Sequence, residues 1–136
     1  METSNLHKTI IATKKSHHST FILFENGIVE VHSNDETIYD VEMIKEVVNE
    51  VGKLTGGKKC KQITVAGIYT SVTKEGRDFM ASDEAVKYTI AEAFVIQSLA
   101  QRILGNFYLK FNRPKVPTKI FTDKQKAEAW LISIGE

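Results

Sequence analysis

Two runs of β-branched and aromatic residues, at 20–25 and 28–33, flank Asn26-Gly27 near the start of the chain. Asn and Gly both tolerate the positive φ of a tight turn, so this pattern predicts a β-hairpin with a two-residue loop. That register places two pairs on the core face: Phe24 with Val29, and Ile22 with Val31. The opposite face is mixed and half apolar, so we expect the N-terminal arm or a second subunit to cover it.

Further along the chain, apolar residues recur at helical spacing in four stretches, and three short apolar runs lie between them. Each helical stretch follows a residue that can cap a helix N-terminus, namely Asp40, Thr73, Ser98, and Thr122 or Asp123. The pattern predicts helices over 41–54, 74–89 (with a break near Ser82), 99–111 and from about 123 onward. Strands are expected at 61–66, 90–96 and 117–121, the last with a proline at its first position.

The resulting order is ββαβαβαβα, which predicts an α/β fold with a mixed β-sheet covered by helices. The chain has 136 residues, a length typical of one domain. We expect a single domain over 20–136, preceded by a polar arm at 1–19 that could carry a short edge strand.

Composition and charge narrow the function classes. The 18 Lys and Arg residues nearly balance the 17 Asp and Glu residues, for a net charge of +1. This balance argues against binding to nucleic acid or to an acidic membrane surface. The single cysteine, Cys60, suits a reducing compartment, and no apolar stretch is long enough for a signal peptide core or a membrane span. These features predict a cytoplasmic protein.

The segment 98–131 carries a more specific pattern. It contains Gly105-Asn106-Phe107, then Asn112 and Pro114, then a short strand and a helix with Ala127 and Trp130-Leu131. With the element order, this pattern resembles the STAS-like (SpoIIAA-like) domains, and in particular a bacterial family of uncharacterised STAS-like proteins. The resemblance covers about 20–134 and implies a STAS fold more than a role, because no activity is assigned to that family.

In STAS antagonists a phosphorylatable serine lies between the third strand and the second helix. Thr73 lies nearest that position, followed by Ser71 and Thr70, so the resemblance implies a switch loop at 70–73. The chain lacks the family's Asp-Ser pair and the glycine after it. A phosphate at a helix N-terminus would be favoured electrostatically, but Thr73 also suits a plain helix cap. Arg77 and Arg102 are candidates for contact with an anion or a partner carboxylate, or for ordinary surface ion pairs.

An aromatic and aliphatic stripe on the helix over 99–111 raises a second function, because Ile103, Phe107 and Phe111 could line an apolar pocket. No catalytic residue, cofactor or metal site is predicted. Glu30, Asp83 and Glu92 show no spacing that would bring two carboxylates together, and the histidines lack a completing ligand.

The sequence therefore favours a non-enzymatic regulatory or protein-interaction module with a protein partner, or a homodimer. The alternative is a small carrier or sensor of an apolar ligand such as a lipid.

Overall fold

The computed structural model describes residues 9–135. Its main strands are β1 (Ile10–Lys15), β2 (Ser19–Phe24), β3 (Val29–Ser33), β5 (Cys60–Val65), β7 (Thr89–Val95) and β8 (Thr118–Phe121). Its helices are α2 (Val41–Leu54), α3 (Lys74–Met80), α4 (Leu99–Phe107) with a π-helical turn η1 (Tyr108–Asn112), and α5 (Lys124–Ser133). Two short strands, β4 (Ile38–Tyr39) and β6 (Ser71–Val72), form a separate parallel pair.

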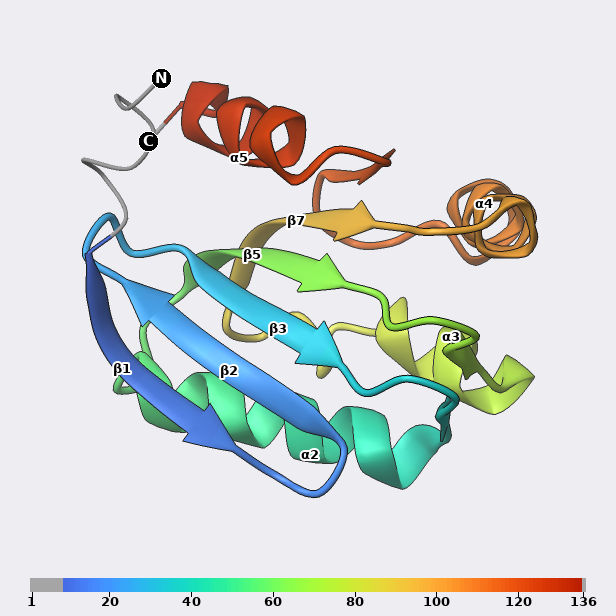
Figure 1. Cartoon of the computed structure of the whole chain (residues 1–136), viewed down its shortest axis with the longest axis horizontal. Helices are drawn as coiled ribbons and strands as arrows, with labels where there is room; N and C mark the ends of the chain where they lie inside the picture. The colour runs from blue at the N-terminus through green and yellow to red at the C-terminus, as the bar shows by residue number, and fades with distance from the viewer. Residues whose placement is uncertain (1–8, 136) are drawn as a thin grey trace.

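The main sheet has six strands in the order β1-β2-β3-β5-β7-β8. The first three are antiparallel neighbours, whereas β3, β5, β7 and β8 run parallel to one another. Helix α2 lies on one side of this mixed sheet and α5 on the other (Figure 1). This arrangement confirms the predicted α/β class, and the predicted order ββαβαβαβα holds once the extra strands β1, β4 and β6 are added.

The hairpin of β2 and β3 exists, but the predicted register is wrong by one residue. Leu23 pairs with Val29 and Phe21 pairs with Val31. The loop has three residues rather than two, because Gly27 N donates to Phe24 O at 2.9 Å and Phe24 N donates to Ile28 O at 3.0 Å. Gly27 has a φ of 88°, which a three-residue hairpin loop requires at that position. The longer loop moves Phe24 and Ile22 to the opposite face.

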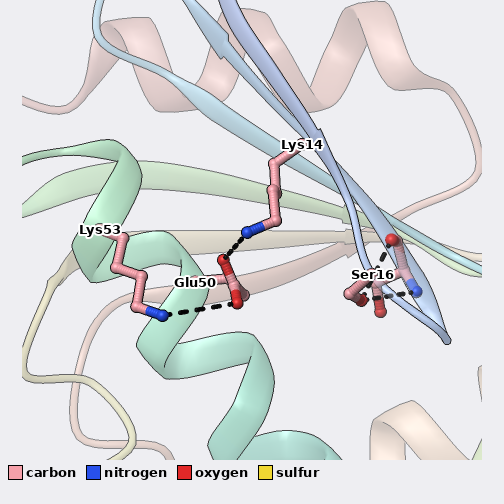
Figure 2. Close-up of polar contacts among 5 residues, drawn as sticks. Lys14, Ser16, Glu50 and Lys53 are labelled. Atoms are coloured by element: carbon pink, nitrogen blue, oxygen red, sulfur yellow. Dashed lines mark hydrogen bonds and ion pairs between the residues drawn. The ribbon is translucent and has the colours of Figure 1, made fainter.

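Helix α2 covers the face that carries Phe21, Val29 and Val31. Asp40 caps it by accepting a hydrogen bond from Met43 N at 2.9 Å, as its sequence position indicates. The edge strand β1 is tied to the same helix, since Lys14 Nζ lies 3.1 Å from the Glu50 carboxylate (Figure 2). Glu50 also lies 3.9 Å from Lys53 of the same helix. Because β1 pairs with β2, part of the predicted N-terminal arm belongs to the sheet.

Helix α5 closes the other face. Its Ala127 and Leu131 are fully buried against Ala91 and Ala93 of β7. Small alanines on the strand let the helix approach closely, and Trp130 and Ile134 pack at the border of the cluster, as the helical spacing predicts.

The predicted helix over 74–89 is shorter than expected. It ends at Met80, and residues 81–88 form a series of turns before β7. The turn begins where Ser82 Oγ donates to Phe79 O at 2.6 Å and Ala85 N donates back to Ser82 Oγ. Ser side chains compete in this way with the helical hydrogen bonds of the backbone. The segment 81–88 therefore crosses the sheet face as a covering loop.

Helix α4 continues into η1 without interruption, as the unbroken helical period of 99–111 predicts. Gly105 lies directly over β8, because a Cβ atom there would lie 2.5 Å from Ile120 Cδ1. The glycine thus allows α4 to approach the sheet at one point. Elsewhere α4 packs lightly, and none of its residues is fully buried.

Candidate functional site

A cavity of ≈ 170 Å³ lies between the sheet and the layer formed by α2, α3, the 81–88 loop and α4. Its floor comes from β3, β5 and β7, and its walls are mostly aliphatic. The apolar lining includes Val31, Val47, Val51, Met80, Val86, Phe94, Leu104 and Ile120. Because α5 fills the other face, this cavity is on the side of the sheet that carries α4.

The most polar feature of the cavity floor is Glu92, which projects from the middle of β7. Its Oε2 atom accepts hydrogen bonds from Thr64 Oγ1 at 3.0 Å and Gln62 Nε2 at 3.1 Å, both from β5. Among residues 9–135 no hydrogen bond reaches its Oε1 atom. Burial raises the pKa of Glu92 to about 7, and the Thr64 hydrogen bond only partly offsets that rise. A substantial fraction of this carboxyl is therefore protonated at neutral pH.

Two other ionisable side chains respond to the same environment. Burial, and secondarily the nearby Glu92 charge, raises the pKa of Cys60 to about 12, and the same two causes raise the pKa of Tyr108. A thiol that stays protonated is a poor nucleophile. The Tyr108 ring packs edge-on to Phe94 with centroids 6.2 Å apart, and within the described chain its hydroxyl has no hydrogen-bond partner.

Arg77 lines the cavity from α3. Its Nη1 donates to Val72 O at 2.8 Å, while its Nε is buried without a hydrogen-bond partner among the described residues. The guanidinium lies 5.9 Å from the centre of the Phe107 ring, within range of a cation–π contact. Arg77 thus lies between the cavity and the outer surface of α4. The sequence indicated only that it lies one turn into the helix.

Two of the three hydroxyl groups in the predicted switch loop at 70–73 make hydrogen bonds within the fold. Thr73 caps α3, because its Oγ1 accepts from Gly76 N at 3.0 Å. Ser71 belongs to β6 and is only partly buried, while Thr70 is buried and donates its hydroxyl to Asn34 O. The hydroxyl groups of Thr70 and Thr73 bond to different parts of the backbone. The structure therefore supports the helix-cap interpretation of Thr73.

The predicted pocket residues face outward instead. Ile103, Phe107 and Phe111 are 62%, 47% and 61% exposed, and none of them lines the cavity. The adjacent row of the same helix, Leu104 and Tyr108, lines it. The prediction was wrong because α4 is apolar on two neighbouring rows, and the helical period does not show which row faces the sheet. Arg102 is also exposed on α4.

Leu99 is 71% exposed and extends the outward row, so Leu99, Ile103, Phe107 and Phe111 form an apolar stripe at four-residue spacing along α4 and η1. The stripe continues toward the loop 66–70, where Ile68 and Tyr69 are also exposed. Gln101 joins the two elements by donating to Gly67 O at 2.9 Å and to Thr70 O at 3.0 Å.

The carboxylates of Glu30 and Glu92 do not form a catalytic pair. Glu30 lies on the α5 face, where it bonds to His32 at 2.9 Å and Lys124 at 3.3 Å, whereas Glu92 faces the cavity. Burial alone would raise the pKa of Glu30, but the His32 hydrogen bond and the Lys124 charge together lower it. Between residues 9 and 135, no group of three or more His, Cys, Asp or Glu side chains could hold a metal ion. In that same range no helix is long and apolar enough to cross a membrane.

Residues 22–134 match the family model of DUF7793, described as a domain of unknown function. The chain belongs to the DUF7793 family. No curated protein matches this DUF7793 chain. The fold has a relative among solved structures, an uncharacterised protein of the DUF3478 family from Shewanella loihica PV-4, described as having a SpoIIAA-like fold. The two structures align with a TM-score of 0.55 over 91% of this chain and 94% of that one, at 13% identity.

This alignment shows a shared fold and confirms the SpoIIAA-like architecture that the sequence predicts for this DUF7793 chain. At 13% identity it does not transfer a ligand or a partner. Of the residues at the cavity, Glu92 could have been singled out from the sequence, because it is a lone acid inside an otherwise apolar strand.

Proposed function

We propose that this domain is a non-enzymatic regulatory module that binds a protein partner through the apolar stripe on α4 and η1. The observation that carries this proposal is the exposure of all four stripe residues along one side of a single helical element. Contiguous exposed apolar surface is costly in water, and it commonly marks an interaction site. Helices that present residues at four-residue spacing are a standard mode of protein recognition.

The charges around the stripe indicate which side chains the partner surface should carry. Residues 98–122 contain five Lys or Arg and no Asp or Glu. Lys110 Nζ lies 5.3 Å from the Phe111 ring centre, so a cation flanks the apolar row directly. One acid approaches from outside the segment, because Asp78 accepts a hydrogen bond from Asn112 at 2.8 Å. The surface therefore suits a partner that offers apolar side chains with carboxylates beside them.

The width of the stripe favours a protein partner over a lipid surface. Arg102, Asn106 and Lys110 form a parallel exposed row immediately beside the apolar row. A helix that lies in a membrane interface presents a broad apolar face instead. A second copy of this chain satisfies the stripe less well, because the cations around it would face each other across a symmetric interface.

Other features support a non-enzymatic role. Glu30 and Glu92 face opposite sides of the sheet, and the Cys60 thiol is buried with a raised pKa. Acid–base or nucleophilic catalysis needs such groups to converge on one accessible point. The single unpaired cysteine also supports a cytoplasmic location, where thiols stay reduced.

The cavity beneath α4 supports a second proposed function, that of a carrier or sensor of a small apolar ligand. The two functions are compatible, since α4 presents one row to the cavity and the next row to solvent.

Site-specific photo-cross-linking in the protein's own cells tests the leading proposal. A photoreactive residue replaces Ile103 in one variant and Phe107 in another. The matched control replaces Ile132, which is 56% exposed on α5. The proposal predicts one discrete protein adduct from both stripe positions and none from the control. Lipid adducts, a second copy of the chain as the sole adduct, or equal adducts at Ile132 would contradict it.

A further inference from the structure

The cavity beneath α4 has the size of a single-ring ligand. Its ≈ 170 Å³ slightly exceeds the roughly 150 Å³ of an engineered apolar cavity that binds benzene. A long acyl chain does not fit such a volume, so the apolar ligand is smaller than the lipid considered from the sequence. The walls of the cavity are mostly aliphatic side chains, from α2 on one side and from α4 and β8 on the other.

The polar groups of the cavity set the chemistry of that ligand. Gln62 and Thr64 both donate to Oε2 of Glu92 and hold the carboxyl in one orientation. The other oxygen, Oε1, takes no hydrogen bond within residues 9–135, and neither does the Tyr108 hydroxyl. A protonated Oε1 donates a hydrogen bond, as does the tyrosine. The protonated Glu92 carboxyl and the Tyr108 hydroxyl are therefore two donors with unsatisfied capacity in an otherwise mostly apolar cavity.

We propose that this cavity binds a small uncharged, ring-sized apolar molecule that carries one hydrogen-bond acceptor for the Glu92 carboxyl. The inference rests on the ligand-binding function proposed second above, and it names the class of ligand. A carboxylate ligand is disfavoured beside Glu92 because it would lose its hydration next to another acid, and the Arg77 guanidinium is already engaged through Nη1 with Val72 O. A cationic ligand is disfavoured because Arg77 already places one cation at the cavity wall.

The ligand series that tests this class has nearly constant size and shape. Acetophenone carries a carbonyl acceptor, isopropylbenzene lacks it, and benzoate replaces it with a charge. Each is titrated into the unaltered full chain, and binding is followed by chemical-shift changes of the backbone amides. Acetophenone should bind about tenfold more tightly than isopropylbenzene, because one buried hydrogen bond contributes that much. The shifts should cluster at cavity residues such as Thr64, Phe94 and Leu104.

The role of Glu92 is tested by pH and by substitution. Acetophenone affinity should fall as the pH rises from 5.5 to 8.5, since an ionised carboxyl no longer donates. Arg77 on α3, Tyr39 of β4, Tyr88 in the covering loop and Tyr108 on η1 also face the cavity, and Cys60 lies near Glu92. Glu92→Gln keeps a donor that does not titrate, so it should retain the preference for acetophenone and lose its pH dependence.

The outcomes separate two failures. If acetophenone and isopropylbenzene bind equally in the cavity, or benzoate binds best, the acceptor class is wrong while the cavity remains a ligand site. If no probe shifts the cavity residues, or the shifts occur only at Phe107 and Phe111, the ligand-binding function itself is wrong. Ala85→Leu adds a localising control, because it fills part of the cavity and should weaken all binding there.

Discussion

The two sides of strand β7 have very different surroundings. Ala91 and Ala93 point toward α5 and are fully buried in a close-packed cluster, whereas Glu92 and Phe94, on the same strand, border a cavity. On the α5 side, small strand residues and a buried leucine fill the space. On the α4 side, the covering helix has no fully buried residue. The difference indicates that β7 is packed for stability on its α5 side and borders a space available for binding beneath α4, while α2 buries a second core elsewhere on that same side of the sheet.

The largest predicted contrast comes from two leucines that lie on opposite covering helices. Leu131→Ala should lower the free energy of unfolding by about 3 kcal/mol, because Leu131 is fully buried and leaves a cavity. Leu104→Ala should cost only about 1 kcal/mol, because Leu104 already borders one. Urea denaturation of both variants measures the difference. Similar losses in the two variants would mean that the faces are packed alike.

Glu92 should make the free energy of unfolding depend on pH. Burial raises the pKa of Glu92 from 4.5 to about 7, so the folded chain retains a proton that the unfolded chain has released. The free energy of unfolding should therefore fall by about 3 kcal/mol as the pH rises from about 4.5 to 7, and then level off.

Glu92→Gln removes this dependence, so its stability should change less over that range and exceed that of the parent above pH 7. Denaturation at half-unit pH intervals compares the two. Parallel pH profiles for parent and variant would show that Glu92 titrates normally in the folded chain.

The 70–73 loop distinguishes a helix cap from a switch. Thr73→Ala should destabilise the chain by about 1 kcal/mol through the lost bond to Gly76 N, whereas Thr73→Ser should keep most of that energy. Thermal denaturation of both variants measures this. If serine proves as damaging as alanine, the hydroxyl cap is not what stabilises the start of α3.

The smallest effect on stability is expected at the stripe. Ile103→Ser removes an exposed side chain, so it should change the free energy of unfolding by less than about 0.5 kcal/mol. The same change should remove the cross-links to the partner that a photoreactive residue at position 107 forms. Ile132→Ser on α5 is the matched change, and it should alter neither. A large loss of stability in Ile103→Ser would show that the stripe belongs to the fold rather than to an interface.

Much of the fold could be predicted from the sequence, because local signals and tertiary structure agree. Asp40, Thr73, Ser98 and Asp123 all cap helices, and the period of 41–54 gives α2 its observed bounds. The hairpin register could not be predicted, since Asn26-Gly27 fits both a two-residue and a three-residue loop. Only the φ of Gly27 and the hydrogen bonds of Phe24 decide between them.

The site was harder to predict for a different reason. Helix α4 carries Ile103 and Leu104 in adjacent positions, followed by Phe107 and Tyr108, so two apolar rows compete for the sheet. The close approach of Gly105 to Ile120 selects the row of Leu104 and Tyr108, and that contact spans two distant parts of the sequence. The cavity results from this choice, which the helical period alone does not determine.

Amide hydrogen exchange tests the contrast between the faces most directly. Under native conditions, the amides of Ala127 to Leu131 in α5 should exchange only through global unfolding, with the full free energy of unfolding. The amides of Arg102 to Phe107 in α4 should exchange through a local opening of clearly lower free energy, because that helix lacks fully buried side chains. Equal protection of the two helices would contradict the proposed contrast between the packed α5 side of β7 and the binding space beneath α4.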